Sequence, residues 1–404
     1  MTQVQLSDRI NAIKTSPTMA VTAKADTLKA AGHDVVGLGS GEPDFDTPDH
    51  IKEAAYKAIA DGMTKYTAVD GTPSLKAAIV EKFQRDNGLD FTPSQIVISC
   101  GGKHSLYNLV QSTVNPGDEA IIPAPYWVSY TDMVVLAGGT PVVVQADITA
   151  RFKVTAEQIA SAITPRTRLL FLNSPSNPTG MCYQRVEWEA IGEVLRKHPQ
   201  IVIATDDIYE HIIWDDEPFS NILNACPDLA DRTVVINGVS KAYAMTGWRI
   251  GYAAASDQLA GAMRKIQSQC TSNPCSISQA AAEAALLGDQ SFLGEMTTVF
   301  RRRHDYVHGR LNAMHGVECL DAQGAFYAFP DFRGAIEAHP TIDNDVEMAE
   351  WLIEAAQVAI VPGSAFGLPG YMRLSYATSD ENLEKAMDRM TDALGGHNSA
   401  SAAD

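Results

Sequence analysis

The stretch that decides the fold is TVVINGVSKAYAMTGWR, residues 233–249. It opens on a short run rich in β-branched residues, at 233–236, which predicts a buried strand. The turn that follows carries Lys241 among small, apolar and aromatic neighbours, and Arg249 comes eight residues later. Lone lysines are usually solvated surface charges, but desolvation here would lower the pKa of Lys241 and leave a usable amine. Since open α/β sheets bind ligands at the carboxyl ends of their strands, the stretch predicts a ligand site.

Short apolar runs alternate with helix-length segments on both sides of this stretch, between about residues 95 and 255. The alternation predicts an α/β fold in which a mostly parallel central sheet is flanked by helices. The expected strands are 96–98, 119–122, 169–172, 201–204, 233–236 and 251–254, and the expected helices include 106–114 and 186–196.

A second, α+β pattern follows a long helical stretch at about 292–314. Apolar pairs near 326–329 and 358–361 are followed by an apolar run at 372–376 and a final helix near 381–394. A chain of 404 residues exceeds one typical domain of roughly 100–200 residues, so two lobes are expected. The expected division is an N-terminal segment 1–45 that packs on the small domain, a large domain 46–290, a small C-terminal domain 291–394 and a disordered tail 395–404.

The composition excludes several classes of protein. With 49 acidic and 31 basic side chains the net charge is −18, which argues against nucleic-acid binding. The N-terminus has no apolar signal region, and no stretch approaches the ~20 apolar residues that cross a bilayer, so no membrane association is expected. The cysteines form neither a zinc spacing nor a disulfide framework, which favours a reducing cytoplasm. They are Cys100, Cys182, Cys226, Cys270, Cys275 and Cys319.

Polar clusters also follow two other expected strands. Asn177 lies in the loop NSPSNPTG at 173–180, which is by itself a turn signal, since Asn-Pro favours turns. Asp206 and Tyr209 follow the run at 201–204, where an acid alone has about even odds of being a helix cap. Three polar clusters at three strand ends favour a site over three separate turns.

Two further segments suit an anion and a planar ring. At Gly101-Gly102-Lys103 a strand passes into a helix, and the N-terminus of a helix offers backbone N–H groups to a phosphate. Such a junction is more often only a tight turn. Trp127 follows another expected strand, where it stacks on a ring or, by default, fills the core.

An amine, an anion clamp, a buried acid, a phenol and a stacking ring are what pyridoxal phosphate requires. The sequence resembles the fold-type I, class I aminotransferases, closest to the bacterial aspartate aminotransferase subgroup, over residues 5–394. The resemblance implies the pyridoxal-phosphate-dependent transferase fold, with the cofactor in the large domain. It rests on motifs in family order at 41–48, 173–180, 206–209, 240–249 and 372–377.

The resemblance implies a role for each cofactor-binding residue. Lys241 would form the internal aldimine, and Asp206 would keep the pyridine nitrogen protonated. The remaining cofactor contacts would be Tyr209 and Asn177 on the 3′-oxygen, Trp127 on the ring, and Arg249, Ser240 and the Gly102–Lys103 amides around the phosphate. A tyrosine of the neighbouring subunit, matched by Tyr66, would reach the same phosphate and implies a homodimer with shared sites. The family often has a serine where this chain has Gly238, which predicts a weaker or shifted phosphate contact.

The resemblance also implies how substrates bind. Arg373 would grip the α-carboxylate with a bidentate fork, helped by Gly41, Asn177 and Trp127. Without the motif around it, Arg373 would more often be a surface salt bridge. In the bacterial subgroup the distal carboxylate is bound by residues that match Lys103, Ser16 and Thr18, and a lysine at the position of Lys14 accompanies prephenate use.

The expected function is L-aspartate:2-oxoglutarate transamination by a ping-pong mechanism in which Lys241 moves the Cα proton. Prephenate, aromatic, kynurenine or alanine transamination and a pyridoxal phosphate C–S lyase remain alternatives, and a regulator that senses the cofactor is a remote one. No metal is expected. His304 and His308 are spaced to share one, but a solvated helix face is the favoured interpretation, and His104 and His211 are interpreted as packing or surface residues.

Overall fold

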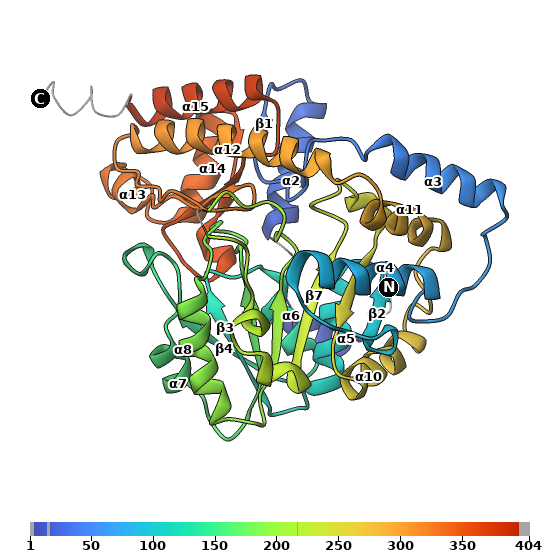
Figure 1. Cartoon of the computed structure of the whole chain (residues 1–404). Coiled ribbons are helices and arrows are strands. Elements are labelled where there is room, and N and C mark those ends of the chain that lie inside the picture. The colour runs from blue at the N-terminus through green and yellow to red at the C-terminus, as the bar shows by residue number, and fades with distance from the viewer. Residues whose placement is uncertain (1–3, 14–16, 216, 396–404) are drawn as a thin grey trace, which may run out of the picture.

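The computed structural model describes residues 4–13, 17–215 and 217–395. A large sheet with helices around it forms the lower part of Figure 1, and a group of C-terminal helices lies above it. That group contains α12 (Ser291–Asn312), α14 (Asp345–Ala355) and α15 (Asp380–Gly395). Both groups of elements contribute residues to the cavity described below.

The large sheet has seven strands in the order β2-β8-β7-β6-β5-β3-β4. Only β8 runs antiparallel to its neighbours, and the other pairings are parallel, so the expected mostly parallel sheet is confirmed. The sequence analysis missed β4, an edge strand of exposed and half-buried residues that does not form a buried run. The strands are β2 (Ile96–Ser99), β8 (Gly251–Ala254), β7 (Thr233–Gly238), β6 (Val202–Asp206), β5 (Thr167–Asn173), β3 (Glu119–Ala124) and β4 (Thr140–Gln145).

Each buried strand sends alternate side chains into two separate cores, as the period of two in a strand requires. In β2, Val97 packs into one core while Ile96 and Ile98 pack into the other. The first core is closed by α5 (Gly102–Thr113), α6 (Ser129–Leu136) and α10 (Asp257–Ser268). The second is closed by α3 (Asp49–Ala60), α4 (Pro73–Lys82), α8 (Arg185–Arg196) and α11 (Ser276–Leu287). Burial on both faces holds the strand ends in place.

The C-terminal elements build a second, smaller sheet with its own core. Its three antiparallel strands lie in the order β11 (Val361–Pro362), β12 (Met372–Ser375) and β9 (Tyr327–Ala328). Buried side chains of α12, α14 and α15 pack against it in one hydrophobic cluster. The sheet matters for function because β12 carries Arg373 and β9 carries Tyr327.

The N-terminal segment contacts both groups of elements. The strand β1 (Val36–Gly37) pairs in parallel with β10 (Val358–Ala359), and α2 (Pro17–Ala30) lies against β10 and β11. The short helix α1 (Asp8–Ala12) instead contacts α6 on the large sheet. The division into domains at 45, 290 and 394 stays a prediction, and residues 396–404 of the expected tail lie outside the described residues. None of the described helices combines the length and the apolar character needed to span a bilayer.

Candidate functional site

A cavity of about 440 Å³ opens at the carboxyl ends of the central strands. It lies between the end of the large sheet and the small sheet, so its walls come from segments far apart in the sequence. Eleven of the residues expected at the site line it. They are Gly41, Gly102, Lys103, Trp127, Asn177, Asp206, Tyr209, Ser240, Lys241, Arg249 and Arg373.

Four expected residues are not among those that line this cavity. Tyr66 is 90% exposed on its own chain. Lys14 and Ser16 lie outside the described residues, and Thr18 lies in α2 but its side chain is not described. The structure therefore brings together the cofactor and α-carboxylate residues of one chain, and the roles of these four stay predictions.

Lys241 follows β7 and projects its amine into the cavity. Its Nζ donates a hydrogen bond to the backbone oxygen of Gly41. Burial lowers the pKa of Lys241 to about 8, and the positive charges of Arg373 and Arg249 act in the same direction. The amine is therefore deprotonated far more readily than a surface lysine, which is the property that a nucleophile or general base needs.

Asp206 ends β6 and is buried at the bottom of the cavity. Burial raises the pKa of its carboxyl to about 6, although a hydrogen bond and the charge of Lys241 favour the ionised form. That hydrogen bond is donated by the Tyr130 hydroxyl to Oδ2, over 2.7 Å. The sequence analysis missed Tyr130. The one sequence feature that could have pointed to it is its position three residues after Trp127, at the start of α6.

Two asparagines connect the strand ends to Arg373. The Asn173 side chain donates to the backbone oxygen of Asp206 over 2.7 Å and accepts from the Asn177 backbone N–H over 2.8 Å. Arg373, from β12, donates through Nη1 to the Asn177 side-chain oxygen over 3.1 Å and through Nη2 to the Gly39 oxygen over 2.6 Å. Its Nε is buried without a hydrogen-bond partner, which leaves a donor for a ligand carboxylate.

The opposite end of the cavity suits an anion. Gly101 precedes α5 with φ of +90°, which favours glycine, and a Cβ there would lie 2.2 Å from Arg249 Nη2 and would force that side chain to move. Arg249 is held over the helix N-terminus by a 2.7 Å hydrogen bond from Nη1 to the Thr246 oxygen. Lys103 lies 4.8 Å above the Trp127 ring, and its pKa is lowered by burial and by the charge of Arg249. Two cations thus line the cavity near the N-terminus of a helix.

Gly238 departs from the family pattern for a packing reason. A Cβ at this position would lie 3.0 Å from both the Gly251 Cα and the Ile250 oxygen, where β7 and β8 are paired. A side chain at 238 would therefore push these strands apart. The predicted change in the phosphate contact is not tested by this geometry and stays a prediction.

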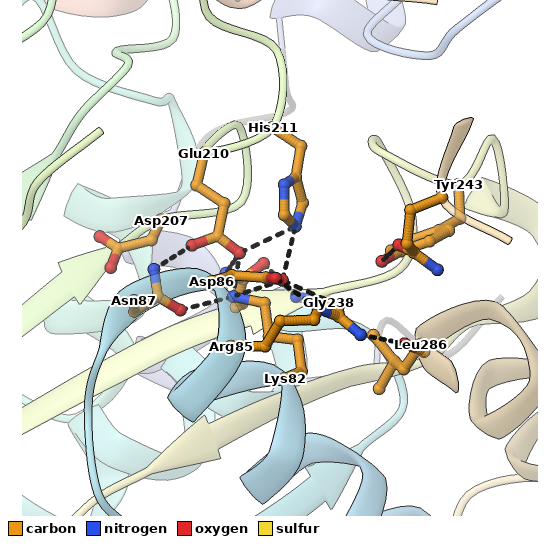
Figure 2. Close-up of polar contacts among 12 residues, drawn as sticks. Lys82, Arg85, Asp86, Asn87, Asp207, Glu210, His211, Gly238, Tyr243 and Leu286 are labelled. Carbon is orange, nitrogen blue, oxygen red and sulfur yellow. Dashed lines mark hydrogen bonds and ion pairs between the residues drawn. The ribbon is translucent and has the colours of Figure 1, made fainter. Parts of the chain in front are cut away.

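Behind the cavity, a buried polar cluster joins the two strand ends that carry Asp206 and Lys241. Figure 2 shows Lys82, Asp86, Asn87, Glu210 and His211 converging there. Lys82, which is 1% exposed, forms an ion pair with Glu210. Glu210 also accepts hydrogen bonds from the side chains of Asn87, over 2.7 Å, and Asn237, over 2.8 Å. The sequence analysis missed Lys82 and Glu210, because nothing local indicates that they meet.

In two groups of the described residues, a ligand atom of a histidine lies near those of two acids. His211 lies 3.4 Å from Asp86 and 3.3 Å from Glu210, beside the Lys82 ammonium, so it belongs to an ion-pair cluster. The interpretation of His304 as part of a solvated helix face was wrong, because this side chain is 2% exposed. Its Nε2 accepts from the Ala322 backbone N–H over 3.0 Å, and its Nδ1 lies 3.0 Å from Asp305. Helix α12 turns His304 toward the buried ring of Tyr376 instead of the solvent.

The family model of the class I and II aminotransferases matches residues 33–390. The chain belongs to the family of class I and II aminotransferases. It is 57% identical to an aspartate/prephenate aminotransferase of Nitrosomonas europaea, over 97% of this chain and 100% of that protein. It is 56% identical to an aspartate/prephenate aminotransferase of Cereibacter sphaeroides, over 95% of this chain and 97% of that protein.

Solved structures confirm the fold class of this aminotransferase. The aspartate aminotransferase from Rhizobium meliloti superposes with a TM-score of 0.94 at 48% identity, over 97% of this chain and 99% of that one. The aspartate aminotransferase from Thermus thermophilus with maleate superposes with a TM-score of 0.91 at 42% identity, over 97% of this chain and 100% of that one. The expected family and the expected transfer of amino groups are confirmed as well.

The aminotransferase family implies pyridoxal phosphate as cofactor, and the cavity fits it. A buried amine of lowered pKa faces the cavity together with a buried carboxyl, and an anion-binding corner lies at the N-terminus of α5. The free Arg373 Nε provides a separate place for a carboxylate. The cavity thus contains a complementary group for a phosphate, for a ring nitrogen and for a substrate carboxylate.

Proposed function

We propose that this aminotransferase binds pyridoxal phosphate and transfers the amino group of L-aspartate to 2-oxoglutarate through Lys241. The observation that carries the proposal is the position of the Lys241 amine, buried in one cavity with Asp206 and Arg373. These three groups have different partners. The amine acts on the cofactor and on the substrate Cα, the carboxylate would bind the ring nitrogen, and the guanidinium would bind the substrate carboxylate.

We assign the cofactor contacts to the residues that line the cavity. Asp206 holds the ring nitrogen protonated, and Tyr209 and Asn177 donate to the 3′-oxygen. Trp127 stacks on the ring. Arg249, Ser240 and the backbone N–H groups of Gly102 and Lys103 hold the phosphate. When bound, the cofactor supplies a cationic ring that accepts the electron pair of the substrate Cα–H bond.

The residues of the chain move the proton and orient the substrate. Lys241 Nζ takes the proton from the substrate Cα as general base and later returns a proton as general acid, which its lowered pKa permits. Arg373 and the Gly41 N–H orient the α-carboxylate during both half-reactions. An amino acid leaves as its 2-oxo acid before a second 2-oxo acid enters, so the kinetics are ping-pong.

The choice of substrate depends on the distal carboxylate. Lys103 extends a cation into the cavity, and we propose that it binds this carboxylate together with Ser16 and Thr18. The close relatives named aspartate/prephenate aminotransferase favour prephenate as a second substrate, with Lys14 as its contact. They give no support to an aromatic, kynurenine or alanine preference or to C–S lyase activity.

We also propose a homodimer that works in the cytoplasm. Tyr66 is 90% exposed on its own chain, which supports a place in the phosphate site of a second copy. All six cysteines are free thiols, and that state suits a reducing compartment. Mixing a Tyr66→Phe chain with a Lys241→Ala chain would then give hybrid dimers in which one of the two sites has all its residues.

An absorbance titration of the purified enzyme with L-aspartate, without any 2-oxo acid, tests the proposal. We expect the visible band of the bound cofactor to be replaced by that of pyridoxamine phosphate, and 2-oxoglutarate to restore it. A visible band that aspartate leaves unchanged would contradict the substrate. The absence of any such band after addition of pyridoxal phosphate would contradict the cofactor and the assignment of Lys241.

The Tyr130→Phe variant tests how the Asp206 carboxyl is kept in its ionised form. Its hydroxyl donates to Asp206, so its loss raises the pKa of this carboxyl above the present value of about 6. Less of the carboxylate is then ionised near neutral pH, and we expect kcat/KM there to fall roughly tenfold. The loss should shrink as pH rises through the new pKa, so the acid limb of the kcat/KM profile moves to higher pH. A uniform loss at every pH would contradict this role.

A further inference from the structure

Tyr327 is fully buried in β9, lines the cavity and contacts two residues of the proposed site. Its hydroxyl lies 2.9 Å from the Tyr209 hydroxyl. Its ring lies under the Arg373 guanidinium, 4.6 Å from centroid to Cζ. One side chain of the small sheet thus touches both the expected cofactor contact and the expected substrate contact.

The ring constrains Arg373 from one side. The guanidinium also lies over a second ring, because its Cζ is 4.9 Å from the ring centroid of Phe366. Nη1 and Nη2 are already bonded to Asn177 and Gly39, and the buried Nε is without a partner. A cation over an aromatic face is attracted by the ring electrons, and this attraction grows where water is excluded. The rings and the two hydrogen bonds therefore restrict the position of the guanidinium, and Nε keeps a donor for a carboxylate.

The hydroxyl of Tyr327 constrains Tyr209 through a hydrogen bond. Either hydroxyl can be the donor in this pair. A phenol has one proton, so when Tyr209 donates to an oxygen in the cavity, Tyr327 must donate to Tyr209. A Cβ on Gly41 would lie 3.1 Å from the Tyr327 oxygen, so the Gly41 backbone packs closely against this hydroxyl. Tyr327 thus sets the direction of the hydrogen bond that Tyr209 makes.

We propose that Tyr327 is a positioning residue with two separable functions: its hydroxyl polarises Tyr209 toward the 3′-oxygen of the cofactor, and its ring holds Arg373 for the substrate carboxylate. The inference rests on the proposed function, because it assumes that pyridoxal phosphate occupies the cavity. Phenylalanine at 327 removes the first function and keeps the second, whereas leucine removes both.

The hydroxyl is tested by a spectroscopic pH titration of holoenzyme. The titratable groups that act on Tyr209 are Tyr327, Arg373, Asp206 and Tyr130, with Lys241 in the same cavity, and Tyr327→Phe changes only the first. A less polarised Tyr209 stabilises the anionic 3′-oxygen less well, so the protonated form of the bound cofactor is favoured. We expect the pH midpoint of the visible absorbance change to rise by roughly half a unit to one unit.

Tyr183→Phe is the matched control for the loss of a buried hydroxyl. Tyr183 exchanges hydrogen bonds with the backbone of Val154 and is not among the residues that line the large cavity. It should lower thermal stability and leave the midpoint unchanged. An unchanged midpoint in Tyr327→Phe would overturn the function of the hydroxyl.

The ring is tested by the affinity of the holoenzyme for maleate, a dicarboxylate that cannot react. We expect Tyr327→Leu to raise the Kd for maleate roughly tenfold, and Tyr327→Phe to leave it within about twofold. If Tyr327→Leu does not fold, Tyr327→Met provides the same loss of the ring with a longer side chain. An unchanged Kd in the leucine or methionine variant would overturn the function of the ring.

These outcomes are distinct from failure of the proposed function. If the wild-type protein shows no visible band with pyridoxal phosphate, both the proposed function and this inference are overturned. If the wild-type protein shows the band and binds maleate, the proposed cofactor stands, and the Tyr327 variants alone decide the inference.

Discussion

Replacing Lys241 with alanine abolishes transamination, by about four orders of magnitude or more in kcat. The same amine holds the cofactor and moves the substrate proton, and no other lysine among the residues that line the cavity lies at the end of β7. Lys241→Arg should be equally inactive, because a guanidinium keeps its proton at every pH of interest. Steady-state rates with aspartate and 2-oxoglutarate measure both losses.

A matched control separates this effect from a general loss of a lysine. Lys265 is exposed on α10, away from the cavity, so Lys265→Ala should retain wild-type rates. Borohydride reduction followed by peptide mass spectrometry should attach the cofactor to the peptide that contains Lys241. Near wild-type turnover in Lys241→Ala, or attachment at another lysine, would refute the assignment.

Lys82→Met should destabilise the protein by about 3–5 kcal/mol, because it leaves the buried Glu210 carboxylate without its cation. Burial alone would raise the pKa of Glu210, but the Lys82 charge holds it below its usual range. The variant removes that effect while Asn87 and Asn237 still donate to the carboxylate. Chemical denaturation followed by circular dichroism measures the loss.

The double variant Lys82→Met with Glu210→Gln shows whether the charge itself is responsible. The neutral amide of the glutamine side chain still accepts a hydrogen bond from Asn237, and it carries no unpaired charge. About half or more of the lost stability should therefore return. The exposed pair Arg185–Glu189 is the control, and Arg185→Met should change stability by less than about 0.5 kcal/mol. Equal losses in the single and double variants would contradict an electrostatic cause.

The Lys82 cluster also links stability to the site. Glu210 follows Tyr209 directly, and Asn237 is four residues before Lys241. Asp206 and Tyr209 line the cavity, while Asp207 and Glu210 are bonded to other side chains behind it. Burial raises the pKa of Asp207 to about 7, with hydrogen bonds from Thr205 and Asn221 opposing that rise. The buried cluster therefore holds in place the backbone segments that carry the cavity residues.

The sequence by itself determined the local structure and the chemistry at the strand ends. The alternation of Ile96, Val97 and Ile98 between two cores follows from the period of two in an extended chain, whatever the strand's neighbours are. Glycine before α5 and a lysine after β7 are likewise local features, and each carries its chemistry in its own side chain or backbone. An edge strand such as β4 was missed because half-exposed residues give a weak signal.

Only the tertiary structure decided which distant residues meet. Tyr130 reaches Asp206, Lys82 reaches Glu210, and the small sheet brings Arg373 and Tyr327 to Lys241. Each pair is separated by many residues, so its contact depends on strand order and on how the two sheets are packed, and not on any local periodicity. Burial then determines the properties of these groups, because the pKa of Lys241 and Asp206 shifts only when packing removes the surrounding water.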